Sequence, residues 1–240
     1  MDLSKSLKDF DKIHKLKIIS YNIKSCDLCT INQLIDFFKK SNYDFILLQE
    51  VDNLTKKNNY KKTELIANAI GYYYYFSSAR KKMGGEFGNS ILSKHRIYER
   101  IKFCLPDKKL ENRCIQGVKI LINDLNIWLF NTHLDWDKTF QIQNNQINNI
   151  YKLLGNYDIK SLIILGGDFN IEKNLIKNKD FLNEYDKQEN TVFTWSSKRP
   201  KSQIDNIFIK NNLNIINYKY SSINTIYSDH KPLICEINLK

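Results

Sequence analysis

Four short apolar runs, each ending in polar residues, constrain the fold of this chain most strongly. The runs are LKIISYN (16–22), DFILLQE (44–50), IWLFNTH (127–133) and LIILGGDFN (162–170). Each is short, rich in β-branched and aromatic residues and bounded by polar residues, which predicts a buried strand rather than a helix. We therefore expect these polar ends to lie along one rim of a sheet.

The remaining pattern mixes strands with helices. Further strands are predicted at residues 72–76, 89–92, 97–105, 113–121, 203–209, 214–220 and 233–239. Apolar residues at helical spacing predict helices that begin at Thr30 and that cover residues 63–70, 139–154 and 175–185. Consecutive strands without a helix between them imply antiparallel pairing. The pattern predicts an α/β fold, a four-layer α/β/β/α sandwich of two mostly antiparallel sheets flanked by helices.

No Pro/Gly/Ser-rich linker divides the 240 residues, and a hydrophobic content of 42% is enough for a sizeable core. We predict one domain over residues 16–240, preceded by an N-terminal extension, residues 1–15, where we expect flexibility. This extension has no apolar segment of signal-peptide length, and no membrane-spanning run follows, so we expect a cytoplasmic protein. Removal of a leader before Met1 would change that expectation.

The charge balance favours polyanionic partners. Lys and Arg number 37 against 26 Asp and Glu, a net charge of +11, which suits nucleic acid and, as the alternative, acidic phospholipid. An AT-rich genome would also enrich Lys together with Asn and Ile, so both explanations of the charge stay open. The basic clusters at 56–62, 80–82 and 198–201 are solvated loops by default.

The five cysteines do not form a zinc motif. Cys26 and Cys29 make the only CxxC, without the second pair that a structural zinc site requires. Cys104 and Cys114 could face each other on a hairpin, although reduced thiols are the simpler expectation. The role of Cys26 and Cys29 stays open.

Acidic residues at strand ends suggest metal chemistry. Glu50 and Asp168 follow apolar runs, where a buried charge is costly unless it is paired or metal-bound. Their oxygens suit Mg²⁺, with Mn²⁺ as a substitute. Asp205 in QIDNIF can hold an imidazole, either that of His133 or that of His230, but spacing does not decide which.

Seven motifs together carry a family resemblance. In order, SYNIK, LLQEVD, GNSILSKHRI, NTHLD, GGDFN, QIDNIF and SDHKPL resemble the endonuclease/exonuclease/phosphatase superfamily, the metal-dependent phosphodiesterases with a deoxyribonuclease I-like fold. The resemblance extends from Leu16 to about Leu239. Each motif is short, and their order makes the set specific.

The resemblance implies roles for ten residues. Magnesium would be held by Glu50, Asn22 and Asp229. The implied catalytic residues are Asp168, which orients or deprotonates the attacking water, Asn170, which supports the phosphate, His133, His230 and Asp205, which orients His230. Asn89 matches a position close to the substrate phosphate, and Glu86 is a candidate to orient His133. Whether Asp168 or His230 is the general base stays open.

The branch of the superfamily is partly constrained. Abasic-site repair endonucleases lack a histidine at the position of His133, and PKSQIDNIF lacks the tryptophan of inositol 5-phosphatases, so both branches are disfavoured. We predict a magnesium-dependent phosphodiesterase that uses in-line attack by metal-activated water, acting as a nuclease on DNA or RNA. The alternative is a sphingomyelinase-type or phosphoinositide enzyme that reaches lipid through Trp136 or the Phe87 loop. A non-catalytic scaffold would be expected to lack these acids and histidines, and the chain has them all.

Overall fold

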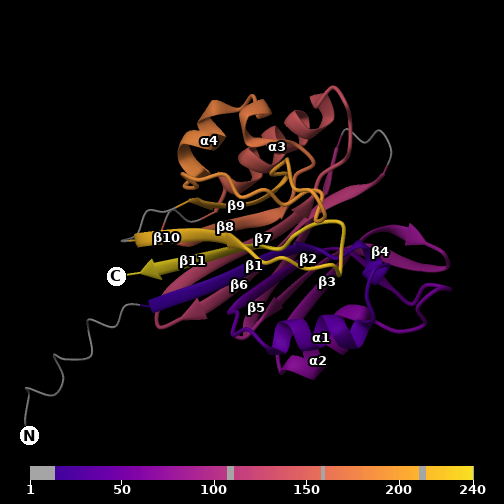
Figure 1. The fold of residues 1–240 in the computed structure, drawn as a ribbon. Coiled ribbons are helices and arrows are strands. Elements are labelled where there is room, and N and C mark those ends of the chain that lie inside the picture. The colour runs from indigo at the N-terminus through magenta and orange to yellow at the C-terminus, as the bar shows by residue number, and fades with distance from the viewer. Residues whose placement is uncertain (1–13, 107–110, 158–159, 211–214, 240) are drawn as a thin grey trace, which may run out of the picture.

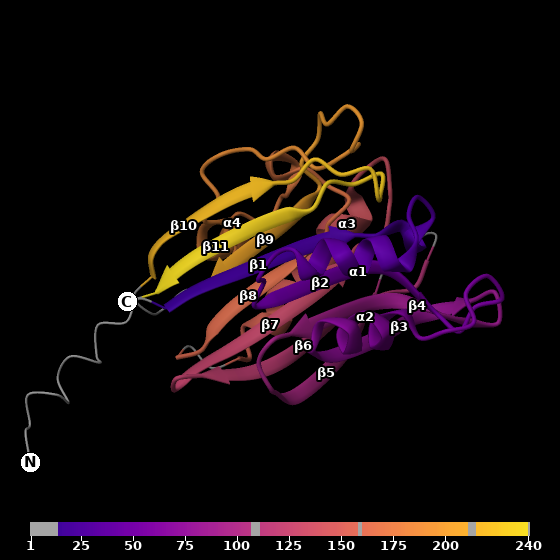
Figure 2. The same cartoon turned by 60° about the horizontal axis from the view of Figure 1, so that its bottom comes forward.

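A computed structural model describes residues 14–106, 111–157, 160–210 and 215–239. These residues form two β-sheets packed face to face (Figures 1 and 2). The first sheet has six strands, in the order β10 (Ile215–Ser222), β11 (Leu233–Leu239), β1 (His14–Asn22), β2 (Phe45–Asn53), β4 (Gly85–Ser93) and β3 (Tyr73–Lys82). The second has five, in the order β5 (Ile97–Leu105), β6 (Arg113–Ile122), β7 (Leu125–His133), β8 (Leu162–Asp168) and β9 (Asp205–Lys210).

Four α-helices in the described part of the chain cover the outer faces of the sheets (Figure 1). The six-stranded sheet packs against α1 (Ile31–Lys39) and α2 (Lys62–Ile70), and the five-stranded sheet against α3 (Gln141–Leu154) and α4 (Lys179–Tyr185). Only β1–β2 and β7–β8 are parallel among the pairs of neighbouring strands described. The predicted four-layer sandwich of mostly antiparallel sheets is therefore confirmed.

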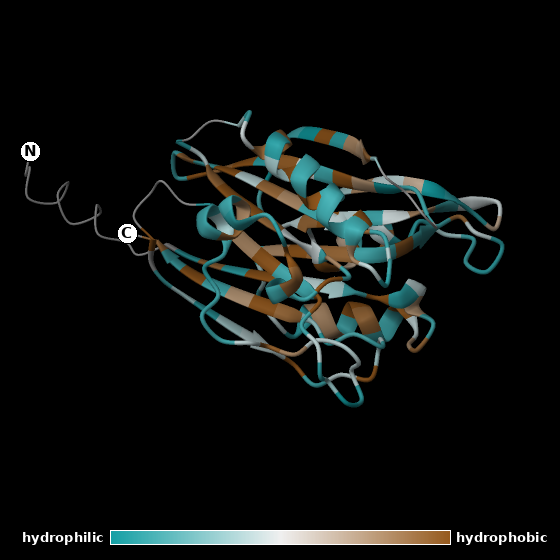
Figure 3. Cartoon of the chain, turned by 90° about the horizontal axis from the view of Figure 1, so that it is seen from above, coloured by the Kyte–Doolittle hydropathy of each residue, from teal (hydrophilic) through white to brown (hydrophobic). Residues whose placement is uncertain are grey.

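Side-chain alternation divides the core into three layers. In β1, Leu16 and Ile18 pack between the two sheets, whereas Ile19 and Tyr21 pack under the helices of the first sheet. Because neighbouring residues of a strand point to opposite faces, one apolar run can supply both layers. Figure 3 shows the result, with hydrophobic residues recurring along the strands and hydrophilic residues dominating the loops.

The helices begin and end where local signals place them. Thr30 caps α1 through a reciprocal bond with Gln33, and Gly71 ends α2 in the left-handed conformation, with a φ of 75°. The prediction of one helix over 175–185 was too long. A 3₁₀ turn covers Lys173–Leu175, and α4 starts afresh because the Asn178 side chain accepts the N–H of Phe181.

Some predicted strands are longer in the structure. The hairpin β3–β4 continues to Lys82 and Gly85, because pairing extends through the polar residues near its turn. β1 begins at His14, two residues before the predicted start of the domain. Residues 1–13 of the predicted extension lie outside the described residues, and so does residue 214, the first residue of the strand predicted over 214–220. Cys104 and Cys114 are cross-strand partners, and all five cysteines are free thiols. No described helix combines the length and apolar character needed to cross a bilayer.

Candidate active site

The polar strand ends gather because each sheet contains one parallel pair. β1 and β2 run in parallel, so Asn22 and Glu50 come to the same end of the first sheet. In the second sheet His133 lies opposite Asp168, which in turn lies opposite Asp205 at the start of β9. The expectation of a single sheet rim was wrong, because the four apolar runs are divided between two facing sheets.

A polar bridge joins the two sheets just below this end. The buried Gln49 donates from Nε2 to Ser20 Oγ at 3.1 Å and to Asn131 Oδ1 of the opposite sheet at 2.8 Å. Asn131 Nδ2 in turn donates to the carbonyl of Leu48 at 2.9 Å. Buried polar groups with partners on both sheets fix their relative register, so the two groups of strand ends are held at a constant separation.

A bulge in β2 directs Glu50. The pairing of β2 with β4 shifts between Leu48 and Val51, and Glu50 lies within that shift with a φ of 55°. A bulge re-aims a side chain, and left-handed backbone at a non-glycine residue is a strained feature that clusters at functional sites. Glu50 is half-buried and therefore reachable from solvent. Asn170, with a φ of 50°, adopts the same backbone conformation.

The amide of Asn22 joins carboxylates from both sheets. Its Nδ2 lies 3.1 Å from Glu50 Oε1 and 2.9 Å from Asp168 Oδ2. Its Oδ1 accepts the backbone N–H of Lys24 at 3.0 Å, which fixes the orientation of the amide. Asn22 thus holds two acidic groups close together.

Gly167 allows the strand that carries Asp168 to approach its neighbour. Its φ is 148°, and a Cβ built there would lie 2.0 Å from the carbonyl oxygen of Thr132. Asp168 is buried, and this burial, reinforced by the Asp205 carboxylate, raises its pKa to about 7 against the opposing charge of His230. Asp168 Oδ1 also accepts the backbone N–H of Asn170 at 3.0 Å.

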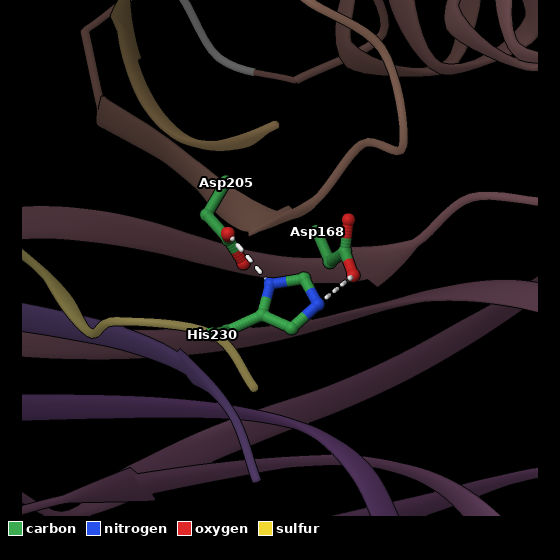
Figure 4. A group of neighbouring side chains, drawn as sticks. All are labelled: Asp168, Asp205 and His230. Atoms are coloured by element: carbon green, nitrogen blue, oxygen red, sulfur yellow. Dashed lines mark hydrogen bonds and ion pairs between the residues drawn. The ribbon is translucent and has the colours of Figure 1, made fainter. Parts of the chain in front are cut away.

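His230 lies between two carboxylates (Figure 4). Its Nδ1 is 2.8 Å from Asp205 Oδ2, and its Nε2 is 3.6 Å from Asp168 Oδ2. Burial alone would lower the pKa of His230, but the two carboxylates outweigh burial and raise that pKa to about 10. The spacing of residues in the sequence did not decide which histidine Asp205 contacts. In the structure this histidine is His230. Ligand atoms of these three residues lie within 4.8 Å of one another, and both ring nitrogens face carboxylates.

Two loops position the SDH motif. Ser228 Oγ donates to the carbonyl of Asn22 at 2.7 Å, and the N–H of Lys231 donates to the carbonyl of Thr194 at 2.7 Å. Asp229 lies at the surface of this loop, where its Oδ2 is 2.6 Å from Lys24 Nζ. The predicted metal ligand Asp229 is thus paired with Lys24, a residue of the SYNIK motif for which the sequence predicted no role.

His133 has a different environment from His230. Its Nε2 lies 3.1 Å from Asn170 Nδ2 and 3.4 Å from Asp168 Oδ2. Its Nδ1 lies 3.1 Å from Nη1 of the buried Arg113. Burial lowers the pKa of His133 well below its usual range, and the Arg113 guanidinium lowers it further. Sequence reasoning missed Arg113, which belongs to none of the seven motifs.

Comparison with known proteins identifies the family to which this chain belongs. A model of the endonuclease/exonuclease/phosphatase family matches residues 19–230. The chain belongs to this family. Members of the family are phosphoric ester hydrolases that depend on a divalent metal, and this chain is accordingly a phosphoric ester hydrolase. A search of curated proteins gave no match.

Solved structures share the fold at low sequence identity. An endonuclease/exonuclease/phosphatase from Beutenbergia cavernae DSM 12333 superposes with a TM-score of 0.77 at 16% identity, covering 94% of this chain and 72% of the other. A humanized D. rerio TDP2 gives 0.73 at 18% identity, with coverages of 93% and 99%. A beta toxin from Staphylococcus aureus gives 0.71 at 17% identity, with coverages of 92% and 99%.

One residue implied by the family resemblance lies elsewhere. Glu86 forms an ion pair with Lys81 at 3.2 Å, its cross-strand partner, and no contact with His133 occurs in the described residues. The reason is strand alternation, because Asn89, three residues later in β4, points to the opposite face. Asn89 is buried between the sheets and donates to the carbonyl of Cys114 at 3.4 Å, one strand away from His133.

A cleft of about 330 Å³ opens beside the GGDFN and SDHKPL motifs. Its lining includes Trp136, Phe140, Trp195, Asn170 and His230. Trp136 and Trp195 are 51% and 46% exposed, so both present large apolar surfaces to a ligand.

Only one of the two aromatic residues named for lipid contact is exposed. Trp136 lies on the surface, but Phe87 is buried, because Arg80 and Lys82 lie over its ring at 4.5 and 4.3 Å from the ring centre. Trp195 was missed, since nothing in its local pattern distinguishes it from an ordinary loop aromatic.

Proposed function

We propose that this family member is a magnesium-dependent phosphodiesterase that cleaves nucleic acid. The observation that carries the proposal is the pair of carboxylates, one from each sheet, that meet at the amide of Asn22, next to the His230–Asp205 pair. Acids, amides and imidazoles that converge from both sheets match what hydrolysis of a phosphoester requires, namely a water-orienting base and several donors to the phosphate.

The donor set fits a hard divalent cation. Glu50 offers a half-buried carboxylate that contacts the amide of Asn22, and Asp229 offers a second carboxylate on the loop that Ser228 joins to the carbonyl of Asn22. The pKa of Asp168 is raised mainly by burial and in addition by the nearby Asp205 carboxylate, against the opposing effect of His230. Oxygen-only donors with access to water suit Mg²⁺, and Mn²⁺ can use the same oxygens. When bound, the cation would polarise a phosphoryl oxygen as a Lewis acid.

The chain's own residues then divide the chemistry. Asp168 orients a water molecule and takes its proton as the water oxygen bonds to phosphorus. The opposite P–O ester bond breaks, and the leaving oxygen takes the proton of His230 and departs as an alcohol. His230, with a pKa of about 10, is protonated at neutral pH and therefore acts as a donor rather than as the base. Asn170 and His133 donate to the phosphoryl oxygens as negative charge develops on them. Asp229 pairs with Lys24, whose charge also interacts with the Glu50 carboxylate.

A basic rim favours a phosphate backbone as the substrate. Lys82 Nζ donates to Ser25 Oγ at 3.1 Å, and that hydroxyl lies 3.4 Å from the carbonyl of Glu50, so the lysine is close to the proposed metal ligand. Arg80 and Lys82 cover the ring of Phe87 and extend this rim. Cations along such a rim bind successive phosphates of a nucleic-acid backbone. Exposed aromatic rings such as that of Trp195 accept a base or a sugar.

A phospholipid headgroup is the second candidate. Leu28 and Ile226, 50% and 79% exposed, line a separate cleft of about 370 Å³ together with Lys24 and Asp229. Apolar tips beside a cation are suited to the surface of a bilayer. This observation favours lipid, whereas the basic rim and the tryptophan cleft favour nucleic acid.

The test is a substrate panel with matched variants. The purified protein with Mg²⁺ would be incubated with supercoiled plasmid, single-stranded DNA, RNA, sphingomyelin vesicles and phosphoinositide vesicles, with and without a chelator. Asp168→Asn removes the proposed base. Asp124→Asn is the matched control, because Asp124 lies in the β6–β7 turn with a φ of 64°, a conformation that asparagine adopts readily.

The outcomes separate the candidates. Cleavage of plasmid, DNA or RNA that requires Mg²⁺, disappears in Asp168→Asn and persists in Asp124→Asn supports a nuclease. Affinity for DNA should then fall steeply with added salt. Cleavage restricted to vesicles would reject the nuclease and leave the phosphodiesterase, whereas equal activity in Asp168→Asn would reject the assigned site.

A further inference from the structure

The two histidines of the site have partners of opposite chemistry. Nδ1 of His230 faces a carboxylate oxygen of Asp205, which can only accept, whereas Nδ1 of His133 faces a guanidinium nitrogen of Arg113, which can only donate. Both imidazoles are buried, with exposed fractions of 6% and 5%. A buried ring adopts the protonation pattern that its partners permit, so the two histidines cannot do the same work.

The partner of His133 fixes the position of its proton. Two donors face the single lone pair of the neutral ring, Nη1 of Arg113 at Nδ1 and Nδ2 of Asn170 at Nε2. A hydrogen bond from a charged donor is the stronger of the two. The lone pair therefore lies on Nδ1, and the proton lies on Nε2. That N–H points toward Asp168 Oδ2, 3.4 Å away. The amide of Asn170, 3.1 Å from Nε2, has its own acceptor, the carbonyl of Leu134 at 3.0 Å.

The result is a pair of adjacent N–H donors. Nε2 of His133 and Nδ2 of Asn170 both carry hydrogen, so neither can accept from the other across the 3.1 Å that separates them. An anionic oxygen placed between two such donors accepts from both, which is the arrangement that stabilises charge developing on a phosphoryl group. With the opposite tautomer, His133 would present a lone pair at this point and would repel the same oxygen.

We infer that Arg113 is a positioning residue that holds His133 as a neutral Nε2–H donor, paired with Asn170, for a phosphoryl oxygen of the substrate. The inference rests on the proposed function and divides its roles further: His230 is the imidazole that carries a positive charge, and His133 donates without releasing its proton. The direction of the pKa of His133 agrees, since burial and the Arg113 guanidinium lower it.

The surroundings of Arg113 keep its guanidinium in place. Nη1 lies 3.4 Å from Glu111 Oε2, and Glu111 Oε1 accepts from Arg80 Nη2 at 2.6 Å. Arg80 in turn lies over the ring of Phe87. This chain of contacts reaches from the second sheet to the first, and the nitrogen of Arg113 that faces His133 is the one that pairs with Glu111. Its side chain is 8% exposed, and a guanidinium carries donors only.

The test reads the tautomer directly. In uniformly ¹⁵N-labelled full-length protein, two-bond ¹H–¹⁵N correlations distinguish a protonated Nε2 from a protonated Nδ1, and the ring of His133 is assigned by its loss in His133→Gln. The wild type is expected to show an unprotonated Nδ1 and a protonated Nε2. Arg113→Met should give a mixture of tautomers and lower kcat about 10- to 100-fold. Arg113→Lys, which keeps a donor, should restore the wild-type pattern and most of the turnover.

Arg100→Met in β5 is the matched control, because Arg100 is exposed and its substitution should change neither readout. A wild-type spectrum with the proton on Nδ1 overturns the inference without any variant, and so does an unchanged tautomer and turnover in Arg113→Met. The spectrum is recorded without substrate. If no substrate is cleaved, the proposed function fails while the spectrum still decides the tautomer.

Discussion

Asp205 Oδ2 accepts a hydrogen bond of 2.8 Å from His230 Nδ1, and through it the first residue of β9 holds the loop before β11. Both residues are buried, and the ring also faces Asp168 on its other side. A buried imidazolium between two carboxylates couples the stability of the fold to the protonation of one residue.

The first prediction concerns pH and stability in the absence of metal. The pKa of His230 is raised from 6.5 to about 10, so the folded state holds this proton more tightly than the unfolded state. The resulting stabilisation is fully present below about pH 6.5 and is lost as the pH rises through about 10. The free energy of unfolding in urea should fall by on the order of 3 kcal/mol between pH 7 and 10. His230→Gln should lack this component, and an identical pH slope in both proteins would disprove it.

The second prediction separates stability from activity at Asp168. The pKa of this carboxyl is raised from 3.8 to about 7, so its ionisation destabilises the metal-free fold, with no cost below about pH 3.8 and the full cost above about pH 7. Asp168→Asn should therefore raise the free energy of unfolding at pH 8.5 by roughly 1–3 kcal/mol, with a smaller effect at pH 5. The same change should lower kcat about 100-fold or more. Loss of stability at pH 8.5 would contradict the assignment of a strained carboxylate.

The pattern of apolar residues predicted the layers of the fold and most of the site, because the buried strands end in the polar residues that form the site. The runs that end at Asn22 and Asp168 are both nearly continuous hydrophobic segments, and each forms a parallel pair buried on both faces. Parallel neighbours bring their polar ends to one edge. The sequence therefore identified the residues that converge.

The sequence did not reveal which sheet each run joins or what lies beside each side chain. Glu86 was expected beside His133, but strand alternation in β4 turns it outward, and the bulge at Glu50 changes the register of the neighbouring strand. Arg113 and His133 lie 20 positions apart on the two strands of the β6–β7 hairpin, and their contact depends on the register of that hairpin and on the conformation of both side chains. A contact of that kind leaves no local pattern in composition or spacing.

The third prediction tests the metal ligand. Mg²⁺ at 100 times its Kd should stabilise the wild type by about 2.7 kcal/mol, measured as a rise in Tm with added MgCl₂. Glu50→Gln keeps the bulged backbone and the size of the side chain but removes the charge, so its Tm should respond only at concentrations at least about tenfold higher. Glu99→Gln in β5 is the control, since its exposed carboxylate pairs only with Lys119 among the described residues. An equal magnesium response in Glu50→Gln would move the ligand role to another acid.

The fourth prediction concerns the tryptophan cleft. Trp195 is 46% exposed and lines the cleft with Asn170 and His230, so its ring is available to a base or sugar of the substrate. Trp195→Ala should raise KM for single-stranded DNA about tenfold or more, because stacking on one aromatic ring contributes about 1–3 kcal/mol. The value of kcat and the Tm should change little, since the ring is not part of the packed core. Phe193→Ala is the matched control: Phe193 is 48% exposed but does not line this cleft. A fall in kcat at constant KM would instead assign Trp195 to the support of the His230 loop, which it contacts through its backbone.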